Sequence, residues 1–241
     1  MFVAVVRSIV TYLAALLYIV VAGPLGILVV VVFRWKRGLY ALGHLGVWLA
    51  LTLAGIRYKV AGRERLPSGA AVFCSNHESN VDPPVLFRAL HPRLHILYKA
   101  ELHKFPIMGP IFDVGGFVPV DRGDRARAMA SISQGAASLR AGNSFLIFPE
   151  GTRSRTGQLL PFKKGGFIMA IEAQAPIVPV AVQGGRAAMR KGSAIVRPVH
   201  VSVSIGTPIP TAGLTIDDRD DLIERVRTEV QKLLAEGPVW T

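Results

Sequence analysis

Residues 70–84 read AAVFCSNHESNVDPP, an apolar run that leads directly into a polar turn. The run at 70–74 predicts a short buried strand, because it is apolar throughout and is followed by turn-forming residues. His77 follows the end of this strand, and Asp82 follows His77 by five positions. This histidine and this carboxylate are therefore the first candidates for a functional site.

Together these two side chains can form a general base that is oriented by a carboxylate. A carboxylate that accepts a hydrogen bond from one ring nitrogen leaves the other nitrogen free to act as a base. On a helix a five-residue step rotates about 140°, so His77 and Asp82 would not share a face. We therefore expect a non-helical turn, which Ser79 and Asn80 favour. Taken alone such a spacing is weak evidence, and a purely structural turn is the alternative.

The chain has 241 residues, of which 51% are hydrophobic. This length allows one globular domain of about 150–200 residues with an appendage. The apolar excess is concentrated in two runs, 2–33 and 39–56, and either is long enough to cross a bilayer. A cleaved signal peptide fits poorly, because the first run is too long for one. We expect residues 1–58 to form a membrane-embedded two-helix motif and residues 59–241 to form an α/β domain.

The sequence leaves open how the two apolar runs meet the bilayer. Gly23-Pro24 interrupts the first run near its middle, and proline removes a helix hydrogen bond and kinks the chain. Three arrangements are compatible with this pattern. They are two spanning helices, a kinked pair within one leaflet, and a first run that bends into its own hairpin at Gly23-Pro24.

The charge of the chain favours a lipid surface as a partner. The formal net charge is +12, and residues 1–60 contain six Lys or Arg and no Asp or Glu. Half of the net charge thus accompanies the apolar runs, which favours attraction to anionic headgroups. Nucleic acid is not expected as a partner, because no nucleic-acid motif is present and the cations are not interleaved with stacking aromatics.

Cysteine and histidine usage argues against other kinds of site. Cys74 is the single cysteine, so no intrachain disulfide forms, and its apolar neighbours predict a small core residue rather than a nucleophile. Pro92 argues against a continuous helix through His91 and His95, and no cysteine pair supports a metal site. We expect neither a metal ion nor a cofactor.

After the apolar runs, strand-like and helix-like segments alternate, which predicts an α/β fold with a central mixed β-sheet covered by helices. The expected strands are residues 71–74, 95–98, 117–120, 145–148, 178–182 and 199–205. The expected helices are residues 84–90, 124–141, 164–174 and 217–236.

A second motif follows the expected strand at 145–148. There the chain runs into Gly151 and Arg153; glycine allows a close backbone approach to a ligand, and a guanidinium offers a bidentate fork for phosphate. Lys99 and Arg122 also follow strand-like runs, and the carboxyl ends of strands are where open α/β sheets place their ligands. No Gly-x-Ser-x-Gly elbow, Walker loop or Gly-x-Gly-x-x-Gly fingerprint is present.

With these residues in view, the chain resembles the glycerolipid acyltransferase family, in particular the bacterial 1-acyl-sn-glycerol-3-phosphate acyltransferases. The resemblance covers residues 60–210. It rests on four ordered motifs and two further elements: Asn76, His77 and Asp82; Gly116 to Arg122; Phe148 to Arg153; Ile177 to Val180; Lys99 to Leu102; and residues 161–165.

The resemblance implies a mechanism. His77 would act as general base on the free hydroxyl of a lysophospholipid, and Asp82 would orient the imidazole. The activated oxygen would attack the thioester of acyl-CoA or acyl-acyl carrier protein, with no covalent enzyme intermediate. The resemblance also implies a set of substrate-binding residues, with cations on the acceptor phosphate and a carboxylate on the glycerol: Lys99, Arg122, Glu150, Gly151, Thr152 and Arg153.

The expected reaction is transfer of an acyl group to the sn-2 hydroxyl of lysophosphatidic acid, which gives phosphatidic acid for phospholipid biosynthesis. The expected location is the cytoplasmic face of a bacterial inner membrane, since the acyl donors are cytosolic. Alternatives are another lysophospholipid or glycerol 3-phosphate as acceptor, a membrane lipid-binding protein without turnover, and a membrane-bound phosphatase or esterase. The acyl-chain length, the donor and the oligomeric state are left open.

Overall fold

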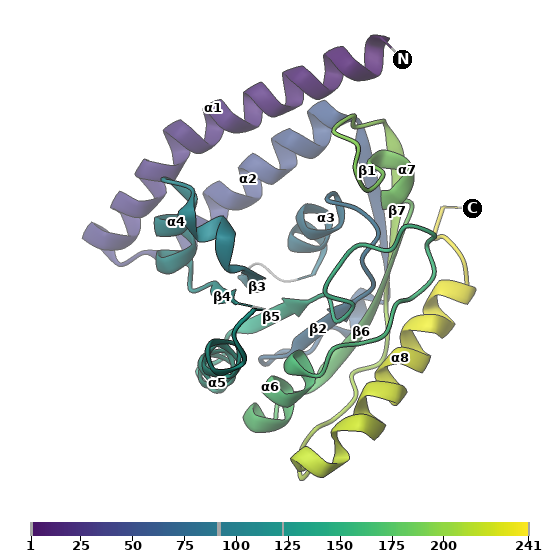
Figure 1. Cartoon of the computed structure of the whole chain (residues 1–241). Coiled ribbons are helices and arrows are strands. Elements are labelled where there is room, and N and C mark those ends of the chain that lie inside the picture. The colour runs from purple at the N-terminus through teal and green to yellow at the C-terminus, as the bar shows by residue number, and fades with distance from the viewer. Residues whose placement is uncertain (1, 91–92, 122, 241) are drawn as a thin grey trace.

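The structure is a computed structural model that describes residues 2–90, 93–121 and 123–240. Figure 1 shows a twisted central sheet with helices on both faces and two long N-terminal helices at one end of the molecule. This arrangement confirms the expected α/β class.

Within the described residues the sheet has seven strands in the order β1-β7-β6-β2-β5-β3-β4. The strands are β1 (Ile56–Ala61), β2 (Val72–Ser75), β3 (Leu94–Lys99), β4 (Val118–Val120), β5 (Ser144–Ile147), β6 (Ile177–Gln183) and β7 (Val199–Ile205). The pairing of β6 with β7 is antiparallel and the other strand pairings are parallel, so the sheet is mixed, as expected. Each of the six expected strands is present.

The helices are α1 (Phe2–Phe33), α2 (Lys36–Ala54), α3 (Asp82–Ala89), α4 (Met108–Gly115), α5 (Arg125–Arg140), α6 (Gly165–Ala173), α7 (Gly185–Ala188) and α8 (Arg219–Ala235). Short 3-10 turns lie at Arg63–Arg65, Ala100–Lys104 and Ile216–Asp218. The four expected helices of the α/β domain are present as α3, α5, α6 and α8.

The sequence pattern missed β1, α4 and α7. In β1 the apolar residues Ile56, Tyr58 and Val60 alternate with cations, which is typical of a half-buried strand. It shares Ile56 with the end of the second apolar run, and residues 57–61 were assigned to no element. β1 pairs in parallel with β7 and also straddles the boundary expected at residue 58.

Successive residues of β2 face opposite layers of the core, as a strand period of two requires. Phe73 packs with Val85 and Leu86 of α3 on the face that also carries α2. Val72 and Cys74 pack on the other face, with side chains of α5, α6 and α8. Both faces of β2 are therefore packed against apolar side chains, and the turn that follows β2 begins at a fixed position.

The first apolar run is one continuous helix, α1, with Pro24 inside it. The alternative of a hairpin at Gly23-Pro24 is therefore wrong. The chain reverses instead at Arg34, which has a φ of 52°, and continues into α2. Among the described helices α1 alone is long and apolar enough to cross a membrane by length and composition.

The two N-terminal helices lie antiparallel and pack through small residues. The hydroxyl of Tyr18 in α1 donates to the carbonyl of Leu42 in α2 at 2.8 Å. A Cβ at Gly46 would overlap the ring of Tyr18, and a Cβ at Gly26 would meet Leu39, so both glycines allow the helices to approach closely.

Asn76 extends the pairing of β2 with β6 beyond the end of the strand. Its side-chain Nδ2 donates to the carbonyl of Val182 at 2.8 Å, and its Oδ1 accepts from the Val182 N–H at 2.7 Å. The buried side-chain amide thus takes the place of one pair of backbone hydrogen bonds between β2 and β6, and it fixes the position of His77.

We predict that Asn76→Ala destabilises the protein by about 2–6 kcal/mol. Both Val182 backbone groups would then be buried without partners, at a cost of about 1–3 kcal/mol each. Denaturant unfolding in detergent measures the change. Asn80→Ala is the matched control, because Asn80 is exposed in the same turn, and its effect should stay within about 0.5 kcal/mol. Equal effects of the two substitutions would contradict the prediction.

Candidate active site

Three neighbouring strands, β6, β2 and β5, run parallel and end at the same edge of the sheet. The segment from His77 to Asp82 follows β2, the segment from Phe148 to Arg153 follows β5, and α7 follows β6. The carboxyl edge of a parallel sheet is a common place for ligands. The two sequence motifs therefore meet here, as their positions after strands predict.

His77 and Asp82 form the expected hydrogen bond in a non-helical turn, with 2.9 Å between Nδ1 and Oδ2. The side chain of Asp82 is 0% exposed and that of His77 is 16% exposed. Because Oδ2 is an acceptor, Nδ1 carries the proton and Nε2 keeps a lone pair. The partly exposed ring thus has the geometry of a general base.

Asp82 is also the first residue of α3, so its carboxylate lies at the positive end of that helix. Oδ2 accepts the backbone N–H groups of Glu78 and Ser79, each at 2.7 Å. On its other side Oδ1 lies against Gly185, where a Cβ would overlap it. Contacts from its own turn and from the segment after β6 therefore fix the position of the Asp82 side chain.

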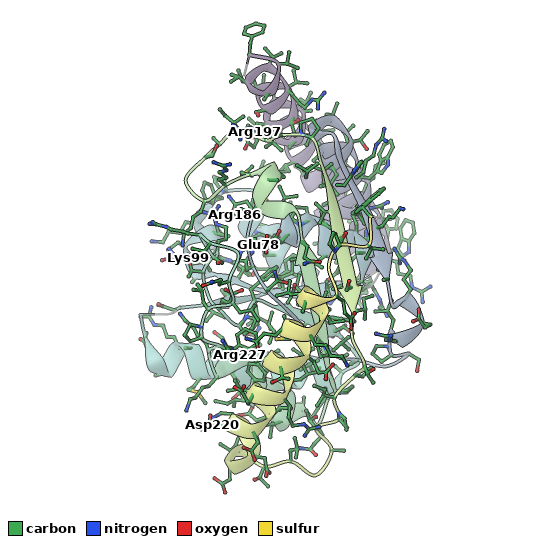
Figure 2. All side chains as sticks on the ribbon, turned by 90° about the vertical axis from the view of Figure 1, so that its right-hand side faces the viewer. Glu78, Lys99, Arg186, Arg197, Asp220 and Arg227 are labelled. Atoms are coloured by element: carbon green, nitrogen blue, oxygen red, sulfur yellow. The ribbon has the colours of Figure 1, made fainter. Side chains whose placement is uncertain are left out.

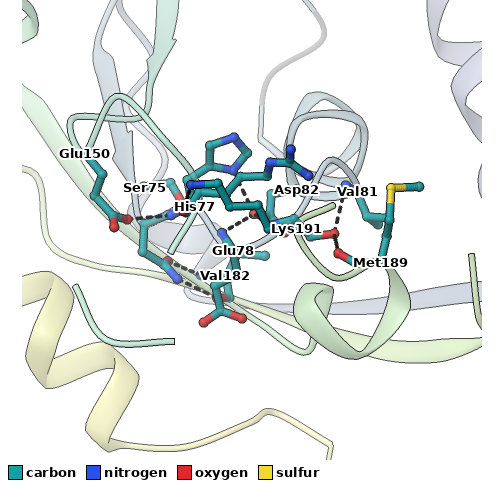
Figure 3. Close-up of polar contacts among 12 residues, drawn as sticks. Ser75, His77, Glu78, Val81, Asp82, Glu150, Val182, Met189 and Lys191 are labelled. Carbon is teal, nitrogen blue, oxygen red and sulfur yellow. Dashed lines mark hydrogen bonds and ion pairs between the residues drawn. The ribbon is translucent and has the colours of Figure 1, made fainter. Parts of the chain in front are cut away.

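The loop after β5 wraps around His77. The ring of Phe148 stacks on the imidazole, with 4.1 Å between ring centroids. Glu150 Oε1 accepts the backbone N–H of His77 at 2.7 Å, and the Ser154 N–H donates to the His77 carbonyl at 2.7 Å (Figure 3). Contacts to the ring and to both backbone groups orient the histidine.

Glu150 itself is buried, at 3% exposure. Its second oxygen, Oε2, accepts the Leu160 N–H at 3.0 Å. Burial raises the pKa of this carboxyl, while the two backbone hydrogen bonds oppose the rise. Both oxygens already bind backbone groups, so Glu150 braces the turn at His77, and its expected contact with the glycerol stays a prediction.

Glu78 lies next to the histidine and was not singled out from the sequence. Burial, helped by the nearby charge of Asp82, raises the pKa of its carboxyl to about 7. The Arg186 N–H donates to this carboxyl and opposes the rise. Figure 2 shows Glu78 beside Arg186, above α8 in this view. Glu78 therefore changes charge near neutral pH within the site.

The predicted cations differ in their surroundings. Arg153 is half-buried in the loop after β5. Lys99 ends β3, is 58% exposed and pairs with Glu101 at 2.9 Å between Nζ and Oε1. Arg122 lies outside the described residues.

Gly151 and Thr152 occupy the turn before Arg153. Gly151 has a φ of 68°, and a Cβ there would collide with the side chain of Lys163, so glycine suits this position. The Thr152 hydroxyl accepts a hydrogen bond from Lys191 at 2.9 Å. Lys191 was missed from the sequence, because it reaches the turn from a loop after α7 and belongs to no recognisable motif.

An apolar cavity of about 380 Å³ lies beside the site. It starts at Pro83 and Pro84, which directly follow Asp82, and continues between α1 and α2. Its wall includes Tyr18, Gly43, Phe87, Ile111 and Phe117. An apolar channel of this kind suits a hydrocarbon chain.

Cys74 is fully buried, as expected of a core residue, and burial raises the pKa of its thiol. Within the part of the chain that the structure describes, no three His, Cys, Asp or Glu side chains gather as potential metal ligands.

We predict that Glu78→Gln becomes more stable relative to wild type as the pH rises from 5 to 8. The folded protein favours protonated Glu78, since the pKa is raised from 4.5 to about 7. The protonated Glu78 side chain contributes fully to stability below about pH 4.5, and this contribution is lost as the pH rises through 7. Glutamine does not ionise, so its contribution stays constant. Melting temperatures in detergent at several pH values measure the difference. Glu172→Gln, at an exposed position on α6, should show a constant difference; a constant difference for Glu78→Gln as well would contradict the prediction.

Comparison with known proteins identifies the family. The family model described as "Acyltransferase" matches residues 57–183. The 1-acyl-sn-glycerol-3-phosphate acyltransferase of Limnanthes douglasii is 32% identical over 206 residues, which cover 83% of this chain and 73% of that protein. The human 1-acyl-sn-glycerol-3-phosphate acyltransferase alpha is 33% identical over 186 residues, which cover 76% of this chain and 66% of that protein.

Among solved structures, the crystal structure of the 1-acyl-sn-glycerophosphate (LPA) acyltransferase PlsC from Thermotoga maritima has the same fold. Its TM-score is 0.86 at 23% identity, and the match covers 100% of this chain and 98% of that chain. The match of the family model over more than half of the chain and the identity to curated relatives show that this chain belongs to the acyltransferase family.

Proposed function

We propose that this protein transfers an acyl group from a thioester to the sn-2 hydroxyl of lysophosphatidic acid and so forms phosphatidic acid. The observation that carries the proposal is the His77–Asp82 pair at the carboxyl edge of the sheet. The names of its relatives support the acceptor. Acyl-CoA or acyl-acyl carrier protein would serve as donor, and the proposed mechanism uses no metal ion or cofactor.

In the proposed reaction His77 Nε2 takes the proton of the acceptor hydroxyl as its oxygen attacks the thioester carbonyl. A carbon–oxygen bond forms, the carbon–sulfur bond breaks, and the leaving thiolate takes the proton from the imidazolium. Asp82, which is fully buried, stabilises the imidazolium that exists between these two transfers. The reaction is then complete without an acyl-enzyme.

The acceptor phosphate would bind to cations at the same edge of the sheet. Arg153 directly precedes Ser154, which donates to the carbonyl of His77, so the guanidinium and the base belong to one connected loop. A guanidinium binds phosphate through two parallel hydrogen bonds. Lys99 and Arg122 would add charge from β3 and from the segment after β4.

An apolar chain of the substrates would occupy the cavity between α1 and α2. The cavity starts directly after Asp82, so a chain within it would leave its polar end close to the base. Many side chains of α1 face outward, among them Leu13, Leu17, Val21 and Leu28. This apolar surface supports insertion of α1 into a bilayer beside the cavity.

We place the protein on the cytoplasmic face of a bacterial inner membrane. The acyl donors are soluble in the cytosol, and the antiparallel pair α1 and α2 returns the chain to the side on which it began. The cluster at Arg34, Lys36 and Arg37 lies at the reversal between the helices and would bind anionic headgroups. A helix pair that lies along the surface of one leaflet keeps this cluster among the headgroups and the α/β domain on the side of the cytosolic donors.

We predict that His77→Ala lowers kcat/KM for CoA release from oleoyl-CoA and lysophosphatidic acid at least 100-fold. General base catalysis typically contributes about 10²–10⁴-fold. His200→Ala, on β7 beside Trp240, is the matched control and should keep wild-type activity. A loss below about tenfold would refute the assignment of the base, whereas lysophosphatidic acid binding without CoA release in the wild type would favour a lipid-binding protein.

We predict that Gly43→Leu shifts the preference of the enzyme towards shorter acyl chains. Gly43 lines the cavity, and a Cβ there makes only ordinary contact with Phe87 at 3.7 Å. Excluding two methylene groups would cost about 1.6 kcal/mol, at about 0.8 kcal/mol per buried methylene, or about tenfold in kcat/KM for the longest chain. Assays with acyl-CoA donors of increasing length measure the shift, and Gly43→Ala should shift it less. An unchanged profile would show that the donor chain does not occupy this cavity.

A further inference from the structure

The segment after β6 contacts both sequence motifs of the site. The Ser79 hydroxyl donates to the Met189 carbonyl at 2.8 Å, and Gly185 lies against the carboxylate of Asp82. These contacts fix residues 185–189 against the turn that holds His77. Side chains that project from this segment are therefore held relative to the base.

Two cations reach the loop after β5: Arg186 projects from this segment, and Lys191 follows its end by two residues. Lys191 Nζ donates to Thr152 Oγ1 at 2.9 Å and to the Arg153 carbonyl at 2.9 Å. Arg186 Nη1 donates to the Thr156 carbonyl at 3.0 Å. The loop from Thr152 to Thr156 is thus tied at both ends to one segment.

The peptide group that follows the Arg153 Cα is consequently fixed, and the residue before it, Thr152, is held through its hydroxyl. Lys191 holds the Arg153 carbonyl, and the next N–H, that of Ser154, donates to the His77 carbonyl. Figure 3 shows Lys191 among the residues that surround the turn from His77 to Asp82. The direction in which the guanidinium leaves the backbone therefore depends on Lys191.

The charges indicate what this arrangement binds. Lys191 Nζ contacts a neutral hydroxyl and the backbone carbonyl of Arg153, and within the described residues neither the Lys191 nor the Arg153 side chain has a carboxylate at ion-pair distance. A cation that has no carboxylate partner attracts an anionic ligand. An ammonium has three N–H donors, so Lys191 keeps one for such an anion.

We infer that Lys191 is a positioning residue for the acceptor phosphate: it holds Thr152 and Arg153 so that the guanidinium meets the phosphate, and it adds its own charge. This role rests on the proposed acyl transfer to lysophosphatidic acid. It extends the phosphate site beyond the sequence motifs to the loop that follows α7.

The test compares Lys191→Met, which keeps the aliphatic length but removes the charge and the donors, with Lys191→Arg, which keeps the charge. With lysophosphatidic acid as acceptor, Lys191→Met should raise KM at least tenfold while kcat falls less than threefold. Lys191→Arg should remain within about threefold of the wild-type KM. Lys232→Met, on the exposed face of α8, is the matched control and should leave both constants unchanged.

A second readout is the rise in melting temperature that lysophosphatidic acid produces, since a ligand stabilises the state that it binds. This rise should be lost in Lys191→Met at ligand concentrations that saturate the wild type. Melting of the free protein shows whether each variant folds. If Lys191→Met does not fold, Thr152→Val removes one of the same hydrogen bonds from the other partner and should raise KM in the same direction.

An unchanged KM and an unchanged ligand-induced rise in Lys191→Met would overturn the inference. A fall in kcat alone would also overturn it, because Lys191 would then serve His77 and not the phosphate. Failure of the proposed function has a different signature, since the wild type would release no CoA. In that case the melting experiment still decides whether Lys191 contributes to binding of the phosphate.

Discussion

One carboxylate oxygen, Asp82 Oδ2, accepts hydrogen bonds from the imidazole of His77 and from the backbone N–H groups of Glu78 and Ser79. The side chain is fully buried, and an unpaired buried charge would cost several kcal/mol. The three donors and the N-terminus of α3 compensate this cost together. The turn, the start of the helix and the orientation of the base are thus one unit, and a change in any of them weakens the stabilisation of the buried carboxylate.

Local patterns in the sequence predicted most of this unit. The alternation of apolar runs predicted six strands, and the His-to-Asp spacing excluded a helix between the two residues. The features that were missed arise where distant segments meet. Lys191 reaches Thr152 across 39 positions, and the cavity is formed by α1, α2, α3 and α4 together, so no short window of sequence contains either feature.

The surroundings of a residue decided what its type left open. A hairpin at Gly23-Pro24 was one of three alternatives, but α1 continues through Pro24, and the neighbouring Gly23 packs closely against Ile107 and Ile111 near α4. Both oxygens of Glu150 accept backbone N–H groups, and the contact with substrate that the resemblance implies for it stays a prediction. In each case the sequence pattern identified an important residue, and packing decided its contacts.

The complete burial of Cys74 has a practical consequence. Its thiol lies inside the central strand with a raised pKa, and the thiolate is the form that reacts with electrophiles and oxidants. The folded protein should therefore be inert to thiol reagents and tolerant of oxidation. CoA can be titrated with such reagents without a background from the protein, and a cysteine introduced on the surface would be the single position that takes a fluorescent or spin label.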